Sequence, residues 1–171
     1  MRSFAFLRGI NVGNRRPKKD ELIAAVAGPE LVDVSTFQAS GNVLFETDVD
    51  GAELEPVLEG RLAERLGYEV ACFVRSLDDL VAIVGDLPPL DPAQKHQVVF
   101  FARPPGEETK AAYEDAAGAT DDLRWREREL LWTHRGGMLD SPLGDALQRL
   151  IPPVNTVRTG ATIERLVARS R

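Results

Sequence analysis

The chain reads Val32-Asp33-Val34-Ser35-Thr36-Phe37-Gln38-Ala39-Ser40-Gly41-Asn42-Val43-Leu44-Phe45 over residues 32–45. Two extended runs are joined here by a short polar turn with the composition of a β-hairpin. We therefore predict two neighbouring antiparallel strands. A further strand is predicted before them at residues 4–7, where a short apolar run ends at Arg8 and Gly9.

Helical patterns separate these strands. Leucine and other apolar residues recur at helical spacing over residues 22–26, before Gly28, and over residues 54–66, before Gly67. A continuous apolar run at residues 70–74 predicts a fourth strand. The order strand, helix, strand, strand, helix, strand is typical of a ferredoxin-like subdomain, in which two helices cover one face of an antiparallel sheet.

The second half is predicted to repeat this order, although no sequence repeat is visible. After a helix at residues 77–84, strands are expected at residues 98–101, 123–126, 130–133 and 154–158, and helices at residues 107–117, 142–150 and 163–169. The expected fold class is therefore α+β, with two ferredoxin-like βαββαβ subdomains packed as one compact unit. We expect the first subdomain to span residues 1–76 and the second residues 77–171.

Composition excludes several classes of protein. The 171 residues are 43% hydrophobic and 28% charged, as in an ordinary globular protein, and the net charge of −6 disfavours sequence-independent binding to nucleic acid. One cysteine and two histidines make neither an internal disulfide nor a recognisable zinc site, so no metal or cofactor is predicted. No apolar run approaches the roughly 20 residues of a membrane helix. We expect a cytoplasmic protein, and the oligomeric state is left open.

The predicted topology brings two polar loops together. The first strand ends at the same edge of the sheet as the hairpin turn, because the second strand runs parallel to the first. The residues expected to meet at this edge are Arg8, Gly9, Asn11, Gly13, Ser40, Gly41 and Asn42. Glycines allow backbone N–H groups to converge on an anion, and the side chains add donors. The alternative is that these are ordinary turn residues.

Basic residues point to the same kind of ligand. Six of them precede the first acidic residue, Asp20, and four lie near the other end of the chain. If the two termini lie near each other, as is common in compact domains, these stretches form one positive surface. Arg158 and Thr159 could then offer a guanidinium, a hydroxyl and a helix N-terminus to an anion. A solvated charged face and an ordinary N-cap at Thr159 are the competing interpretations.

The motifs carry a family resemblance. Leu7-Arg8-Gly9-Ile10-Asn11-Val12-Gly13, followed by Ser40-Gly41-Asn42-Val43-Leu44-Phe45, resembles the bacterial family of unknown function DUF1697. Phe73-Val74-Arg75-Ser76 and Thr156-Val157-Arg158-Thr159 match later landmarks of that family. Two asparagines of its closing motif are replaced here by Thr159 and Ala161. The resemblance implies a small cytoplasmic α+β protein of two similar subdomains, with no established activity, cofactor or partner.

Three functional hypotheses remain. The first is binding of a small phosphate- or carboxylate-bearing ligand at the glycine-containing edge between the subdomains. No residue pair has the pattern of a general acid and base, so no reaction is assigned and enzymatic activity is left open. The second is binding of RNA or single-stranded nucleic acid, and the third is a structural or partner-binding role without a ligand. Cys72 lies within an apolar strand and is predicted to be an unreactive core thiol.

Overall fold

The computed structural model describes residues 1–11, 13–38, 41–149 and 154–170. The chain divides into two compact units. Unit 1 comprises Met1–Val81 and Leu166–Arg171, and unit 2 comprises Ala82–Arg165. The predicted boundary after Ser76 falls at the start of a helix and stays a prediction.

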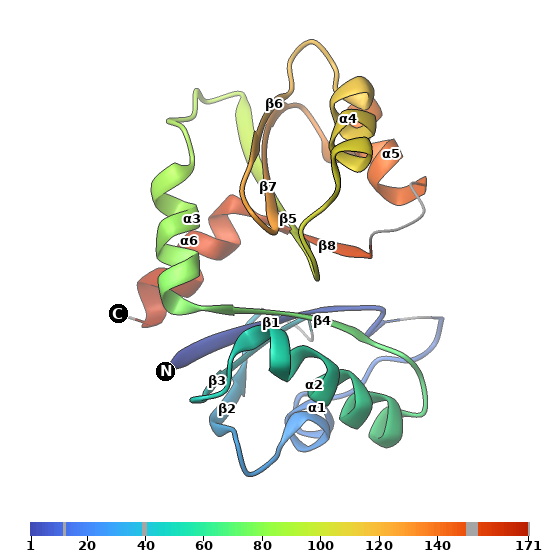
Figure 1. Ribbon diagram of the computed structural model, residues 1–171, viewed down its shortest axis with the longest axis vertical. Coiled ribbons are helices and arrows are strands. Elements are labelled where there is room, and N and C mark those ends of the chain that lie inside the picture. The colour runs from blue at the N-terminus through green and yellow to red at the C-terminus, as the bar shows by residue number, and fades with distance from the viewer. Residues whose placement is uncertain (12, 39–40, 150–153, 171) are drawn as a thin grey trace. The chain divides into compact units, whose positions relative to one another are not determined.

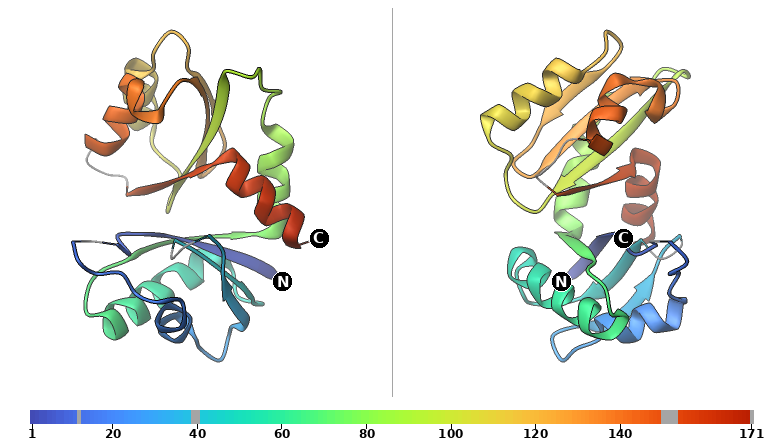
Figure 2. Two further views of the ribbon diagram at one scale, coloured as in Figure 1. Left: turned by 180° about the vertical axis from the view of Figure 1, so that it is seen from behind. Right: turned by 90° about the vertical axis from the view of Figure 1, so that its right-hand side faces the viewer.

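Unit 1 contains a four-stranded antiparallel sheet with two helices. Its elements are β1 (Arg2–Arg8), α1 (Lys19–Val26), β2 (Val32–Thr36), β3 (Asn42–Glu46), α2 (Gly51–Leu66) and β4 (Ala71–Ser76). The strands lie in the order β2-β3-β1-β4. Both helices cover the same face of the sheet (Figures 1 and 2). The predicted ferredoxin-like fold of this half is confirmed.

Alternation along the strands explains the core of unit 1. Ala5 and Leu7 of β1 face the helices, as do Val43 and Phe45 of β3, because side chains alternate across a strand. They pack against leucines of both helices: Leu22, Leu54, Leu58 and Leu62. Burying each leucine contributes roughly 1.5–3 kcal/mol. These contacts fix the positions of α1 and α2, and with them the loops that precede and follow the helices.

The edge strand β4 is held by carboxylates of α2. The backbone N–H groups of Cys72 and Val74 donate to Glu59 Oε1 and Glu55 Oε1, each over 2.9 Å. Glu55 also lies 3.4 Å from Nη1 of Arg75, which is buried. An edge strand otherwise exposes unpaired N–H groups to other chains. The two glutamates therefore tie the helix to the sheet and cover part of this edge.

Unit 2 repeats the same sheet. After α3 (Leu77–Asp86), which begins in unit 1, come β5 (Gln94–Phe101), α4 (Glu107–Ala116), β6 (Asp122–Trp125), β7 (Glu129–Arg135), a 3₁₀ turn η1 (Met138–Asp140), α5 (Pro142–Arg149), β8 (Asn155–Thr159) and α6 (Gly160–Ser170), which belongs to unit 1 from Leu166 onward. The strand order β6-β7-β5-β8 corresponds to that of unit 1. In Figure 1, α4 and α5 lie together beside this sheet. The predicted duplication is confirmed.

Strand pairing matches the two units residue by residue. Phe4 pairs with Leu44 and Arg75 in unit 1, and Val98 pairs with Leu131 and Arg158 in unit 2. The two fourth strands therefore align as Val74-Arg75-Ser76 and Val157-Arg158-Thr159. This short repeat is the sequence trace of the duplication, and it was not recognised from the sequence because the flanking residues differ.

Two sequence expectations need adjustment. The first strand of unit 2 begins at Gln94 and not at residue 98, because the polar residues His96 and Gln97 are buried in it and paired with β7. The helix after β4 extends to Asp86 and not only to residue 84. Neither change alters the topology. None of the helices in the described ranges has the length and hydrophobicity of a membrane-spanning segment.

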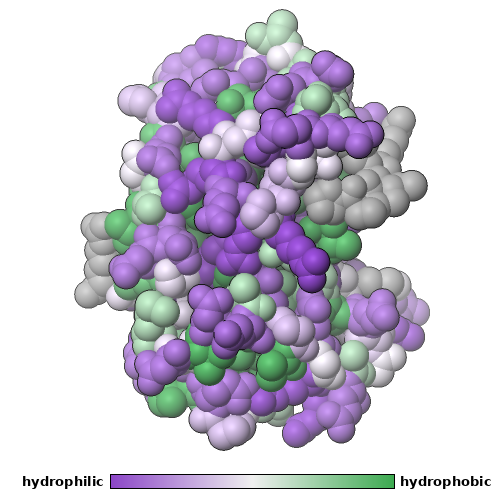
Figure 3. All heavy atoms as spheres, viewed as in Figure 1, coloured by the Kyte–Doolittle hydropathy of each residue, from purple (hydrophilic) through white to green (hydrophobic). Residues whose placement is uncertain are grey.

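One face of the molecule is polar (Figure 3), and the single cysteine is buried in the core of unit 1. The face shown in Figure 3 is mostly hydrophilic, with apolar side chains in small separate areas. Cys72 is fully buried, and burial raises the pKa of its thiol well above the usual value. Its prediction as an unreactive core residue is therefore supported by both its packing and its ionisation.

Candidate functional site

The two predicted loops of unit 1 lie at one edge of the sheet. Leu7 N donates to Gly41 O over 2.9 Å, and Phe6 pairs with Asn42 in the register of β1 and β3. The end of β1 and the turn between β2 and β3 are therefore neighbours, as the topology predicts. Ser40 lies outside the described residues.

The first loop requires glycine at two positions. Gly9 has φ +82° and Gly13 has φ +60°, both in the left-handed region that most side chains avoid. This conformation lets the chain turn away from β1 before it reaches α1. Arg8 and Asn11 have exposed side chains on this loop and at its start.

Asn42 has a structural contact in the second loop. Its Nδ2 donates to Phe37 O over 3.0 Å, and Phe37 N donates to Asn42 O over 3.0 Å. Only 5% of its surface is exposed. The asparagine therefore closes the hairpin. Its predicted role in orienting a ligand stays a prediction.

Arg158 and Thr159 belong to unit 2. Thr159 caps α6, because Thr162 N donates to Thr159 Oγ1 over 3.2 Å. Arg158 Nη1 donates to Thr156 Oγ1 and to Val157 O, each over 2.8 Å. Burial lowers the pKa of Arg158 to about 10. The structure thus gives each residue an internal contact within unit 2, and their predicted contribution to an anion site stays a prediction.

A hollow of about 470 Å³ opens beside the loop that joins β1 to α1. Its polar lining consists of Arg15, Arg16, Glu21, Arg65 and Tyr68, and its apolar lining of Pro17, Ala24, Ala25 and Leu66. These residues come from the β1–α1 loop, from α1, and from the end of α2 with the segment after it. We call this feature the arginine hollow.

Tyr68 holds the loop that forms one wall of the arginine hollow. Its hydroxyl donates to Ile10 O over 2.9 Å, and the guanidinium of Arg15 lies 4.8 Å from the centre of its ring. The cation–π contact restricts where Arg15 can point. One side chain therefore contacts the loop at both Ile10 and Arg15 and links it to the segment after α2.

Two arginines of unit 1 outside the arginine hollow form ion pairs with glutamates. Arg2 and Arg61 pair with Glu46 and Glu30, at 3.3 and 2.5 Å. Within the ranges that the structure describes, Arg15, Arg16 and Arg65 form no ion pair. Apart from the contact between Arg15 and the ring of Tyr68, their charges are consequently left to solvent or to a ligand.

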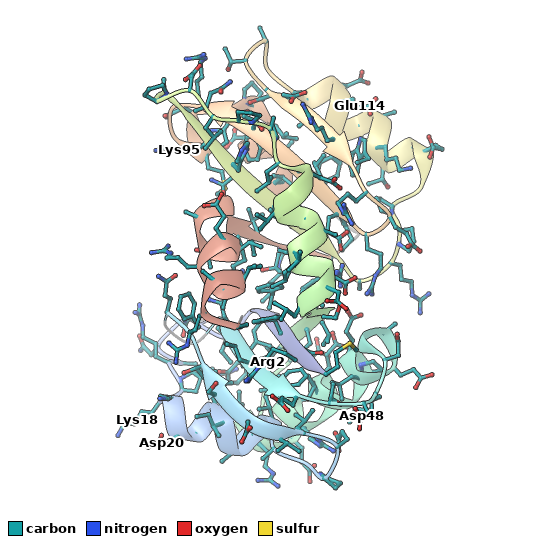
Figure 4. The ribbon with its side chains drawn as sticks, turned by 90° about the vertical axis from the view of Figure 1, so that its left-hand side faces the viewer. Arg2, Lys18, Asp20, Asp48, Lys95 and Glu114 are labelled. Carbon is teal, nitrogen blue, oxygen red and sulfur yellow. The ribbon has the colours of Figure 1, made fainter. Side chains whose placement is uncertain are left out.

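The carboxylate of Glu21, which lines the arginine hollow, accepts a hydrogen bond at the start of α1. Lys18 N donates to Glu21 Oε2 over 2.7 Å, so that Glu21 caps the helix. Figure 4 shows Lys18 and Asp20 together at this end of α1, projecting outward. The lining therefore combines three guanidinium groups with one carboxylate that already accepts a hydrogen bond.

Comparison with known proteins places the chain in a family. The family model described as "Protein of unknown function (DUF1697)" matches residues 1–131. The chain belongs to the DUF1697 family. Arg158 and Thr159 lie beyond the matched residues, whereas all of the arginine hollow lies within them. A search of curated proteins found no match to this DUF1697 protein.

A solved structure shares the fold. It is that of the conserved bacterial protein SP0830 from Streptococcus pneumoniae, with a TM-score of 0.79 and 21% sequence identity. The comparison covers 98% of this DUF1697 chain and 97% of that one. At this sequence identity, the similarity shows that the two chains share a fold and shows nothing about function.

Sequence reasoning identified only part of the arginine hollow. Arg15 and Arg16 belong to the basic stretch recognised before Asp20, but Arg65 and Tyr68 were missed. A basic residue in the last turn of a helix is an ordinary partner of the helix dipole, so Arg65 gave no separate signal. Among the described residues, no cluster of histidine, cysteine or acidic side chains could hold a metal ion.

Proposed function

We propose that unit 1 of this DUF1697 protein binds a small phosphate- or carboxylate-bearing ligand in the arginine hollow, next to the glycine-containing edge. The observation that carries the proposal is that three arginines line one hollow and that none of them forms an ion pair within the described residues. Arginine matches the geometry of both phosphate and carboxylate. The volume of the arginine hollow lies within the usual range for metabolite sites.

Each group has a separate role in this proposal. Arg15, Arg16 and Arg65 would neutralise the ligand, and Tyr68 would hold Arg15 in place. Gly9 and Gly13 give the loop the course that brings the first two arginines to the arginine hollow. The proposal assigns binding and no reaction, since the lining carboxylate already caps α1.

A thermal-shift screen of sugar phosphates, nucleotides and small carboxylic acids tests the proposal. We expect at least one compound to raise the melting temperature of the full chain, and Arg65→Gln to abolish that rise. Arg103→Gln, at an exposed position in unit 2, is the matched control and should respond as the wild type does. A rise that persists in Arg65→Gln, or no rise with any compound, would contradict the proposal.

The predicted contributions of Arg8, Arg158 and Thr159 can be measured in the same screen. If Arg8 is part of the site, Arg8→Ala weakens the rise in melting temperature that the compound causes, measured relative to the melting temperature of the same variant without the compound. Thr159→Ala removes the cap of α6 and should cost about 1 kcal/mol whether or not a ligand is present. A further loss of the ligand response in Thr159→Ala would support a role in binding.

Nucleic-acid binding receives less support. A ferredoxin-like sheet binds RNA by stacking bases on exposed aromatic side chains. Phe4, Phe6 and Phe73 are fully buried, and the net charge is −6. We expect no retention of RNA in filter binding near physiological salt.

A cytoplasmic location is also part of the proposal, supported by the single buried cysteine.

A further inference from the structure

We infer that the arginine hollow selects phosphate monoesters, which are dianions, over carboxylates and other monoanions. This inference rests on the proposed function and adds the class of ligand. It follows from the charge of the lining, from the separate elements that supply the arginines and from the apolar residues of the lining.

The lining charge matches a dianion. Arg15, Arg16 and Arg65 contribute three positive charges and Glu21 one negative charge, which leaves an excess of two. A carboxylate or a sulfate ester would balance one of these charges. A phosphate monoester carries nearly two negative charges above its second ionisation, near pH 6. The electrostatic complement of the arginine hollow is therefore a phosphate group.

The arginines reach the arginine hollow from separate elements. Arg15 and Arg16 are supplied by the β1–α1 loop, and Arg65 by the last turn of α2. A phosphate monoester has three terminal oxygens arranged around phosphorus, whereas a carboxylate has two in one plane. Arginines supplied by different elements are suited to contact the separate oxygens of this group.

The floor fits a small ligand body. Ala24, Ala25 and Leu66 give an apolar surface next to the arginines. Arg15 already lies against the ring of Tyr68, so this contact occupies an aromatic face that a nucleobase could use. We therefore favour a phosphate monoester of a small organic molecule over a nucleotide.

The selectivity predicts a specific pH dependence. Methyl phosphate gains its second charge as the pH rises through about 6, whereas methyl sulfate keeps a single charge. Titration of protein groups in this interval would affect both anions, so methyl sulfate is the internal control. Affinity for methyl phosphate should therefore increase about tenfold from pH 5 to pH 7.5, relative to methyl sulfate.

Two-dimensional NMR of the full chain, titrated with methyl phosphate, methyl sulfate and acetate, tests this inference. We expect methyl phosphate to bind most tightly, to shift the amide signals of Ala24, Leu66 and Tyr68, and to show the tenfold pH effect. Arg16→Gln and Arg65→Gln should each weaken binding about tenfold, and Arg103→Gln should not. All three arginines are exposed, so we expect the variants to fold as the wild type does. Unchanged amide signals outside the arginine hollow would confirm this.

The outcomes separate the two proposals. Equal affinity for the three anions, or methyl phosphate binding that does not depend on pH, would overturn the selectivity and leave anion binding in unit 1 standing. Shifts confined to residues away from the arginine hollow, or no shift with any anion, would overturn both.

Discussion

The turn between the second and third strands lies against the end of the first strand in both units. In unit 1, Leu7 N donates to Gly41 O over 2.9 Å, and in unit 2, Phe101 N donates to Arg128 O over the same distance. Gly41 and Arg128 therefore occupy equivalent places. This backbone contact therefore does not require glycine.

The difference between the two edges lies in the loop that follows the first strand. Residues 9–18 join β1 to α1, whereas residues 102–106 join β5 to α4. The longer loop of unit 1 has two glycines with positive φ and carries arginines into the arginine hollow. In unit 2, Arg128 Nη1 instead donates to Ala102 O over 3.2 Å. Loop length, and not topology, distinguishes the unit with the candidate site.

The polar contacts that hold helices to sheets also differ. Unit 1 uses Glu55 and Glu59 of α2, which accept from β4. Unit 2 uses Asp121, which accepts from Gly118 N, Trp132 Nε1 and Ser141 Oγ at 2.7, 3.0 and 2.6 Å. Because both tryptophans belong to unit 2, tryptophan fluorescence reports on that unit, and far-UV circular dichroism reports on both.

Glu55→Ala should have the largest effect. It removes a carboxylate that accepts from Val74 N and pairs with buried Arg75, so we expect a loss of about 3–5 kcal/mol in the free energy of unfolding. Urea unfolding followed by circular dichroism measures it. Glu64→Ala, at an exposed position of the same helix, is the control. A loss below about 1 kcal/mol would show that α2 is held without this contact.

Asp121→Ala tests the corresponding contact in unit 2. Three hydrogen bonds to one carboxylate are lost, and we expect a destabilisation of about 3 kcal/mol. Urea unfolding followed by tryptophan fluorescence should detect it directly. The neighbouring Asp122→Ala removes an exposed carboxylate paired with Arg124 and should cost less than about 1 kcal/mol. Equal effects of the two variants would refute the role of Asp121.

Gly160→Ala tests the junction between β8 and α6, which corresponds to the junction between β4 and α3 in unit 1. Leu77 occupies the equivalent place after β4, but a Cβ at residue 160 would lie 2.7 Å from Cβ of His96. We expect a destabilisation of about 1–3 kcal/mol in urea unfolding. Gly60→Ala, where no atom lies within 4 Å of the added carbon, should instead stabilise α2 by about 1 kcal/mol. Gly160→Ala as stable as the wild type would mean that His96 moves easily.

The smallest expected effect is a pH dependence of the free energy of unfolding that arises from one ion pair of unit 1, between Glu30 and Arg61. The hydrogen bond from Arg61 lowers the pKa of Glu30, so the folded state binds this proton less readily than the unfolded chain does. The resulting stability is present above the ordinary pKa of glutamate and is lost as the pH falls through the lowered value. Glu30→Gln should therefore reduce stability at pH 6 more than at pH 3, in urea titrations at both values. Glu64→Gln should show no such difference.

The fold could be predicted because its signals are local. Apolar runs that end at Gly9 and Gly67, together with the hairpin composition at residues 38–42, define strand order in unit 1. In unit 2 the start of β5 was missed because His96 and Gln97 interrupt the apolar pattern while remaining buried by pairing with β7. Burial of polar residues depends on partners distant in sequence, which a periodicity does not reveal.

The candidate site could be predicted only in part. The topology brings residues 8–13 and the turn before Asn42 to one edge, and this follows from strand order. The arginine hollow depends instead on the packing of α1 against the end of α2, which brings Arg65 close to a loop some fifty residues earlier. The absence of ion pairs at Arg15, Arg16 and Arg65 in the described part of the chain is likewise a property of the folded arrangement.

Cys72 has a consequence for following the motions of unit 1. It is the chain's single sulfhydryl, fully enclosed and held in its protonated form. An alkylating reagent can therefore modify it only when β4 and α2 separate. The rate of labelling would give the frequency of that opening in the wild-type protein, in the half of the molecule that has no tryptophan.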